Sequence, residues 1–354
     1  MLTLVAGTMD RVSGTGAETP ATTLARLISG AQVARMISVA AELGIADLLA
    51  DGPRTPDDLA AVTETHPPSL YRLLRALASV GIFAEERDGR LGLTPLGDLL
   101  RTGVTGSMRG LALFQNDEWY WQVYRELPYS VRTGKPATQY LWGDGLFGYL
   151  ASHPQAAELF DSGMASRHAE TNAALANAYD FSGIDTLVDV GGGNGSLLAT
   201  ILAAHPNMNG ILFDLPRVAE GATGRLAQAG VAQRCQIVGG DFFDSVPAGG
   251  DAYVLSNVLH DWQDEPAAAI LRAVQRAMGG RGRLLVVNEQ VIPPGDGPHP
   301  GKLGDITMLL IGGRERTEAE WRQLFAQAGF MLARIAPLPS RTGAGVLEGQ
   351  LATT

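Results

Sequence analysis

The chain has 354 residues, of which 45% are hydrophobic and 18% charged, and its formal net charge is −10. The length favours two domains. The acidic balance argues against non-specific binding to nucleic acid, which depends on Lys and Arg neutralising phosphates. The single cysteine, Cys235, excludes an intramolecular disulfide and a cysteine-rich zinc site, and it fits a reducing, cytoplasmic setting.

Residues 1–20 are predicted to be a flexible tail, because they lack the basic start and long apolar stretch of a secretion signal. No apolar run reaches the roughly 18 residues that a membrane span requires, so no membrane partner is expected. Helices are predicted to follow the tail. The apolar residues of the first recur at helical spacing: Leu24, Leu27, Ile28, Val33, Met36 and Ile37.

The rest of residues 21–105 has the pattern of a winged helix. A short apolar helix in AELGIADLLADG is predicted to end at Gly52, and residues 55–86 are predicted to form two helices joined by a Pro-Pro turn. Thr55 is placed as the N-cap of the first of these, with Pro56 in its first position. Residues 82–94 are expected to form a hairpin that turns at Asp88-Gly89.

A winged helix suggests a DNA-binding protein, but the charges of residues 21–105 disfavour that function. This segment carries eight Arg, no Lys and ten acidic residues, which gives 8 − 10 = −2 and no basic stripe. Dimerisation or substrate covering is the favoured role. A ligand-responsive regulator that binds DNA stays the weaker alternative.

Two further segments complete the predicted organisation. Residues 106–182 are helical and rich in aromatic residues, some of which are expected to line an apolar pocket. From 183 to 354, strands alternate with helices: TLVDV, GILFD, CQIVGGD, AYVLSN and RLLVVNE, with helices at 196–205 and 266–278. This alternation predicts a Rossmann-like α/β fold, with a parallel sheet that has helices on both faces.

The stretch VDVGGGNGS places a glycine turn between a strand and a helix. Gly191, Gly193 and Gly195 permit positive φ angles and the close approach of a ligand. The pattern departs from the dinucleotide fingerprint, since Ser196 occupies its third glycine position. Asp189 would repel a pyrophosphate and attract an ammonium group, which favours S-adenosylmethionine over NAD. A tight turn without a ligand is the alternative.

Two acidic residues at later strand ends fit an adenosine. Asp214 ends GILFD, 23 positions after Gly191, where an acid commonly binds ribose hydroxyls. Asp241 precedes Phe242 and Phe243, so a carboxylate and an aromatic face are available for adenine. Leu215, directly after Asp214, is counted with the predicted cofactor site. Each acid taken singly could equally be a helix cap.

A histidine follows the fourth predicted strand, in LSNVLHDWQDEP. His260 is expected at the carboxyl edge of the sheet, where open α/β sheets bind their ligands. A phenol with a pKa near 10 is scarcely ionised at neutral pH, so methyl transfer to it benefits from a positioned base, and His titrates in the useful range. Glu289 and Glu315 are candidates for orienting this base, although either could be a surface charge.

At this point the motifs resemble those of the S-adenosylmethionine-dependent O-methyltransferases of the caffeic-acid and hydroxyindole type, in their bacterial natural-product branch. The similarity runs from about residue 20 to the end. The motifs that carry it are VDVGGGNGS, FDLP, GDFF, LSNVLHDWQDE, NEQVIPP, DITMLLIGGRERTEAEWRQLFAQAGF and GAGVLEGQ. The resemblance implies a helical N-terminal dimerisation domain, a homodimer and a C-terminal catalytic domain.

The resemblance also implies roles for particular residues. It implies that Gly191, Asp214, Asp241 and Phe242 hold the cofactor, and that His260 is the general base, flanked by Glu289 and Glu315. The acceptor-binding positions that it implies, with Asp261 beside the base added to them, are Phe160, Met164, Asp261, Asp305 and Met308. Plant members carry a Lys four residues before the base, where this chain has Ser256.

The expected activity is methylation of a hydroxyl on an aromatic, polyketide-like or phenolic metabolite, with S-adenosylhomocysteine as the second product. No metal is expected, because no cluster has metal-ligand spacing. The sequence leaves the acceptor open, and a carboxylate or nitrogen acceptor stays possible. Some bacterial relatives of this fold decarboxylate or hydroxylate instead, and the His260-Asp261 pair argues against that alternative.

Overall fold

The computed structural model describes residues 19–288, 291–340 and 344–352, so most of the predicted tail and Glu289 lie outside the described residues. The chain divides into two compact units. One comprises the described residues up to Gln122 together with His153–Arg167, and the other comprises Val123–Ser152 and the residues from His168 onward. The boundaries predicted from composition, after 105 and after 182, stay predictions.

The first unit is mainly helical, with one small sheet. Its elements in chain order are α2 (Pro20–Ile28), α3 (Gly30–Glu42), α4 (Ile45–Leu48), α5 (Pro56–Thr63), α6 (Pro67–Ser79), β1 (Phe83–Glu85), β2 (Leu91–Leu93), α7 (Pro95–Asp98) and α8 (Arg109–Phe114). Helices α9 (Glu118–Arg125) and α13 (Pro154–Ala178) each run from one unit into the other. The core of this unit is formed by buried residues that include Leu59, Leu74, Leu77 and Phe83.

The predicted winged-helix elements are present, with three corrections. The helix predicted around Leu24–Ile37 is interrupted at Ser29, which caps α2. The helix predicted to end at Gly52 is a single turn that ends at Leu48. Pro67 and Pro68 do not form a turn; they open α6, because proline at the first helical positions loses no intrahelical hydrogen bond.

Two local predictions in this unit are confirmed. Thr55 caps α5, since its side chain accepts a hydrogen bond from the Asp58 N–H, and Pro56 is the first helical residue. The hairpin forms as two antiparallel strands, with Phe83 opposite Leu93 and Gly89 at φ 81° in the turn.

The second unit carries a seven-stranded sheet with helices on both faces. Its helices are α10 (Leu127–Thr133), α11 (Ala137–Trp142), α12 (Gly145–Ser152), α14 (Ser196–Ala204), α15 (Pro216–Gly221), α16 (Thr223–Gln228), the 3₁₀ turns η1 (Ala232–Arg234) and η2 (Leu259–Asp261), α17 (Asp264–Met278), α18 (Pro300–Ile311) and α19 (Glu318–Gln327). Its strands are β3 (Thr186–Val190), β4 (Asn209–Asp214), β5 (Cys235–Gly239), β6 (Ala252–Ser256), β7 (Arg283–Asn288), β8 (Phe330–Pro337) and β9 (Gly345–Leu351).

The strand order is β5-β4-β3-β6-β7-β9-β8. The five predicted strands are parallel, but the sheet as a whole is mixed, because β9 lies antiparallel between β7 and β8. The two strands that make the sheet mixed, β8 and β9, were not among those predicted. The strand order reverses at β3, and such a reversal opens a crevice at the carboxyl ends of the strands. The glycine turn follows β3, so it lies at this crevice.

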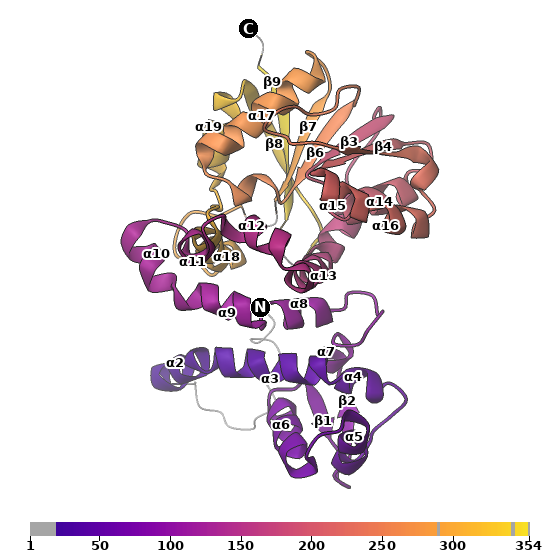
Figure 1. Cartoon of the computed structure of the whole chain (residues 1–354), viewed down its shortest axis with the longest axis vertical. Coiled ribbons are helices and arrows are strands. Elements are labelled where there is room, and N and C mark those ends of the chain that lie inside the picture. Colours follow the sequence, from indigo (N-terminus) through magenta and orange to yellow (C-terminus); the bar gives the residue numbers. More distant parts are fainter. Residues whose placement is uncertain (1–18, 289–290, 341–343, 353–354) are drawn as a thin grey trace. The chain divides into compact units, whose positions relative to one another are not determined.

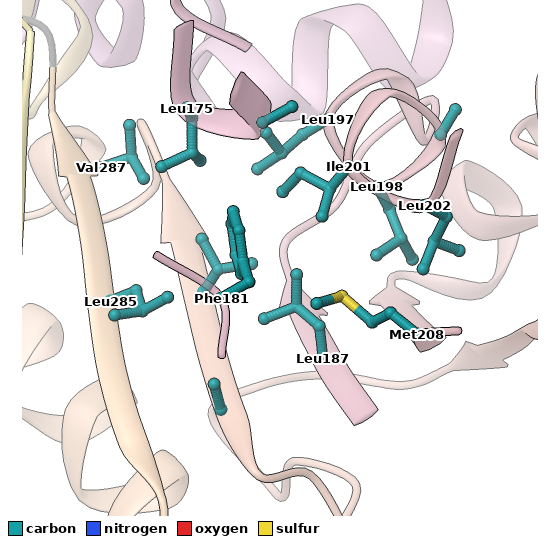
Figure 2. Packing of buried hydrophobic residues seen from close by; sticks show 14 of the residues in the cluster. Leu175, Phe181, Leu187, Leu197, Leu198, Ile201, Leu202, Met208, Leu285 and Val287 are labelled. Atoms are coloured by element: carbon teal, nitrogen blue, oxygen red, sulfur yellow. The ribbon is translucent and has the colours of Figure 1, made fainter. Parts of the chain in front are cut away.

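Alternate residues of each strand enter the two cores on opposite faces of the sheet. On one face, Leu187 and Leu285 pack against α13, α14 and α16. Figure 2 shows this cluster, with Leu197, Leu198, Ile201 and Leu202 of α14 facing Leu187 of β3. On the other face, Val188 and Val286 pack against α17 and α19, which Figure 1 shows on the side of the sheet away from α14. The sheet is thus held rigidly between two apolar layers.

Within the described ranges, no helix is long and apolar enough to cross a membrane.

Candidate active site

The glycine turn lies between β3 and α14, and its backbone is packed closely on one side. Gly191 has a φ of 73°, and a Cβ there would lie 2.7 Å from Cγ2 of Val258, so only glycine fits. Gly193 has a φ of 56°, and a Cβ there would meet nothing within 4 Å. The turn therefore packs against the segment after β6 at Gly191 and is open at Gly193.

Asp189 lies beneath this turn. It is 1% exposed, and its Oδ2 is buried without a hydrogen-bond partner among the residues that the structure describes. Burial, with a smaller contribution from the Asp214 carboxylate, raises the pKa of Asp189 to about 7. A buried oxygen without a partner is a group that the ammonium of a ligand could satisfy, so this observation fits a ligand with an amino-acid end.

Asp214 ends β4 and joins the turn directly. One of its oxygens accepts from the Gly193 N–H at 2.8 Å and the other from the Leu215 N–H at 2.7 Å. Burial raises the pKa of Asp214, and these two N–H groups oppose the rise. Each oxygen retains a lone pair for a ribose hydroxyl. Leu215 is about half exposed beside it and offers an apolar surface.

Asp241 and a cluster of aromatic rings form the next part of the site. Asp241 is exposed two residues after β5, and its Oδ1 accepts from the Phe243 N–H at 2.8 Å. Phe242 lies 5.0 Å from Phe243 and 6.0 Å from Trp262, measured between ring centroids. Trp262 was not among the predicted residues. Neither its spacing nor its charge indicates from the sequence that this tryptophan contacts Phe242.

Ser256 ends β6, and its hydroxyl lies 3.5 Å from Nδ2 of Asn257. Asn257 has a φ of 53°, an uncommon backbone conformation for a residue with a side chain. This bend leads the chain into Val258, which packs on Gly191, and then into η2. The cofactor-type turn and the histidine-bearing turn are thereby in contact through Gly191 and Val258.

His260 lies in η2, with its imidazole between two carboxylates. Nδ1 is 2.8 Å from Oε1 of Glu315, and Nε2 is 3.5 Å from Oδ1 of Asp261. The His260 side chain is 14% exposed, and Glu315 is buried. Burial raises the pKa of Asp261 to about 6, and the Glu315 charge adds to the rise, whereas His260 opposes it. Glu315 therefore lies where a residue that orients the imidazole would lie. Glu289, the other candidate, is outside the described residues.

Glu315 is itself fixed from α18 and from the loop that follows it. Its N–H donates to Oδ1 of Asp305 at 2.7 Å, so Asp305 positions Glu315. The Met308 carbonyl accepts from the N–H groups of Gly312 and Gly313. A Cβ at Gly313 would lie 2.1 Å from the His260 carbonyl oxygen, so glycine is needed where the loop crosses η2.

The two remaining predicted residues belong to the other unit. Phe160 and Met164 lie on the part of α13 assigned to the first unit, where Phe160 packs edge-on against Phe114 with centroids 5.5 Å apart. Their role in acceptor binding stays a prediction. Among the residues that the structure describes, no group of three or more His, Cys, Asp or Glu could hold a metal ion.

The sheet, with the glycine turn at its crevice between β3 and α14, has the architecture of a Rossmann-like α/β enzyme. The model of the O-methyltransferase domain family matches residues 124–331, and that of the O-methyltransferase dimerisation domain matches residues 25–103. The chain therefore belongs to the O-methyltransferase family. The second match supports the predicted homodimer.

Individual relatives agree with this assignment. The chain is 45% identical over 328 residues to the phenazine O-methyltransferase PhzM of Lysobacter antibioticus, covering 92% of this chain and 95% of that protein. It resembles the crystal structure of LaPhzM with a TM-score of 0.87, 44% identity and coverage of 94% and 99%. It also resembles NcsB1 from neocarzinostatin biosynthesis in complex with S-adenosylmethionine and 2-hydroxy-5-methyl naphthoic acid, with a TM-score of 0.77, 36% identity and coverage of 93% and 98%. The predicted cofactor is thereby confirmed.

Some relatives perform a different reaction. The aclacinomycin 10-hydroxylase RdmB of Streptomyces purpurascens is 38% identical over 303 residues, covering 84% of this chain and 81% of that protein. An 8-amino-8-demethylriboflavin N,N-dimethyltransferase of Streptomyces davaonensis is 40% identical over 311 residues, covering 86% and 89%. Overall similarity therefore does not by itself fix the acceptor atom.

Proposed function

We propose that this protein methylates a hydroxyl group of an aromatic secondary metabolite, with S-adenosylmethionine as the methyl donor and His260 as the general base. The observation that carries the proposal is the His260–Glu315 pair, 2.8 Å apart beside the glycine turn. We propose Asp189, Gly191, Gly193, Asp214, Leu215, Asp241, Phe242 and Ser256 for cofactor binding, and a cytoplasmic location.

The carboxylate at Nδ1 sets the chemistry of His260. When the Nδ1–H of a neutral His260 imidazole donates a hydrogen bond to Glu315, the Nε2 of the same ring is unprotonated. This nitrogen takes the proton of the acceptor hydroxyl, and Glu315 stabilises the imidazolium that results. Asp261, beside Nε2, is placed to stabilise the same charge when ionised. Bound S-adenosylmethionine supplies the methyl group from its sulfonium.

The protein's further contribution is to hold the two reactants. Asp214 and Asp241 bind the adenosine, and the ring of Phe242 offers it an apolar face. Asp261, Asp305 and Met308 are the acceptor-binding residues of this unit that we propose. Holding two reactants in line converts a bimolecular step into an effectively unimolecular one, which is a large part of the rate enhancement available to such a site.

The test is an assay of purified protein with S-adenosylmethionine and a panel of aromatic acceptors. The panel contains hydroxyphenazines, hydroxynaphthoates and phenols, each matched with its amino analogue and with the analogue that lacks the hydroxyl. We expect a product heavier by one methylene group only from acceptors with a hydroxyl, together with S-adenosylhomocysteine. Methylation of the amino analogues alone would contradict the hydroxyl assignment.

A second candidate is a reaction on the same fold without methylation, which the similarity to an aclacinomycin 10-hydroxylase favours. It predicts decarboxylated or hydroxylated products from acceptors that carry a carboxyl group. It also predicts no S-adenosylhomocysteine, so the same assay separates the two candidates.

A further inference from the structure

The segment after α18 crosses the turn that carries His260, and two backbone contacts join them. The Arg314 N–H donates to the His260 carbonyl at 2.7 Å, and Gly313 packs directly against this carbonyl. The side chain of Arg316, two residues further on, also contacts the turn. The turn is therefore held by a neighbouring loop as well as by its own short 3₁₀ hydrogen bonding.

Arg316 makes the side-chain contacts. Its Nη1 donates to the Leu259 carbonyl at 2.9 Å and its Nη2 to the Trp262 carbonyl at 2.7 Å. Its Nε donates to Oδ1 of Asp264 at 2.9 Å, at the start of α17. The guanidinium therefore hydrogen-bonds to carbonyls of the turn before and after His260.

The surroundings of Arg316 provide an acceptor for each nitrogen of its buried guanidinium. The side chain is 0% exposed, and burial lowers its pKa while the Asp264 carboxylate opposes the change. Burying a cation is unfavourable unless its donors are satisfied, and here three of its nitrogens have protein acceptors. A planar guanidinium has donors at fixed angles that a lysine ammonium does not reproduce.

We propose that Arg316 is a positioning residue for methyl transfer: by holding the carbonyls of Leu259 and Trp262, it fixes the turn that presents His260 and the Trp262 ring. The inference rests on the proposed function of His260. Arg316 touches neither reactant; it acts through the backbone of η2. Its loss moves the base and the aromatic cluster near Asp241 together.

The variants are Arg316→Lys and Arg316→Met. The lysine keeps the positive charge but not the planar set of guanidinium donors, and the methionine removes both the charge and the donors. The matched control is Arg322→Lys on α19, whose guanidinium also pairs with a carboxylate, Glu318, and donates to a carbonyl, but away from the turn. We expect both Arg316 variants to lower kcat at least tenfold and Arg322→Lys to change it less than twofold. If the Arg316 variants do not fold, Asp264→Asn replaces them. It weakens the charged hydrogen bond between Arg316 and Asp264, and it should lower kcat about threefold.

Two readouts separate positioning from a general loss of structure. The first is the pH titration of the His260 imidazole by NMR with labelled histidine. Among the described residues, the carboxylates of Glu315 and Asp261 face this imidazole, and Asp305 lies behind Glu315. We expect Arg316→Lys, or Asp264→Asn, to shift this titration. An unshifted titration together with an unchanged kcat would overturn the proposal.

The second readout is the effect of Arg316→Lys in a His260→Ala background. If Arg316 acts in part through His260, the added substitution lowers kcat by a smaller factor in the His260→Ala background than in the natural protein; an equal loss in both backgrounds would overturn the proposal. The two proposals fail differently. A fully active His260→Ala variant refutes the base role, whereas a shifted His260 titration still shows that Arg316 fixes the imidazole.

Discussion

Among single residues, Asp189 gives the clearest prediction about pH. Its pKa is about 7 in the folded protein, because the carboxyl is buried, and near 4 in the unfolded chain. Between these values the folded state binds a proton that the unfolded state has released. The free energy of unfolding therefore falls as the pH rises from about 4 to about 7, and it stays at the lower level above.

The test compares Asp189→Asn with the natural protein in urea unfolding at pH 6 and pH 8. The asparagine does not titrate, so we expect the stability of the variant relative to the natural protein to rise by about 1 kcal/mol over this interval. Asp244→Asn, at an exposed position, is the control. An identical pH dependence in all three proteins would show that Asp189 is ionised at both pH values.

The residues that we propose for cofactor binding from the sequence share one property: each lies at or just beyond a strand end. Gly191, Asp214 and Asp241 follow directly from the order of strands, because parallel strands bring their carboxyl ends to one edge. Arg316 and Trp262 could not be found in this way. The roles that we propose for Arg316 and Trp262 rest on contacts with backbone carbonyls and rings that are distant in sequence.

At the scale of elements, the same distinction explains the corrections to the fold. The five parallel strands were predictable because each is a short apolar run next to a helix of the right period. β9 was not, since its place between β7 and β8 depends on a long-range pairing, Leu284 to Gly349, that leaves no local signal. The Pro-Pro pair was misinterpreted because proline suits both a turn and the first turn of a helix.

The glycine turn gives a prediction at this scale. Gly191→Ala would force a left-handed alanine, which costs about 1–2 kcal/mol, and would place its Cβ against Val258. Gly230→Ala is the matched control, because Gly230 has a similar φ of 70° and open space around it. We expect Gly191→Ala to lower the melting temperature more than Gly230→Ala and to weaken binding of S-adenosylhomocysteine at least tenfold, measured by calorimetry. Equal losses in the two variants would mean that the contact with Val258 relaxes freely.

At the scale of the whole molecule, α2 carries a prediction about assembly. Leu24, Leu27 and Ile28 recur at helical spacing and are 58%, 49% and 72% exposed in the single chain. Exposed apolar rows of this kind mark surfaces that pack against another protein, and this helix overlaps the segment that matches the dimerisation domain. We expect this row to be covered by the partner subunit.

The measurement is the mass in solution by light scattering for a Leu24→Glu, Ile28→Glu double variant. We expect a monomer, because two charges would be buried without partners in the dimer. Val62→Glu, which replaces an exposed apolar residue of α5, is the control and should stay dimeric. A double variant that remains a dimer would place the interface elsewhere.

The proposed role of His260 as the base for methyl transfer is tested by the His260→Ala variant. The measurement is the single-turnover rate of methyl transfer with the best acceptor, made together with the affinity for S-adenosylhomocysteine and with His66→Ala as an exposed control. We expect a rate lower by about 10²–10⁴ with unchanged affinity, as is usual for loss of a general base. A rate equal to that of the natural protein would contradict it.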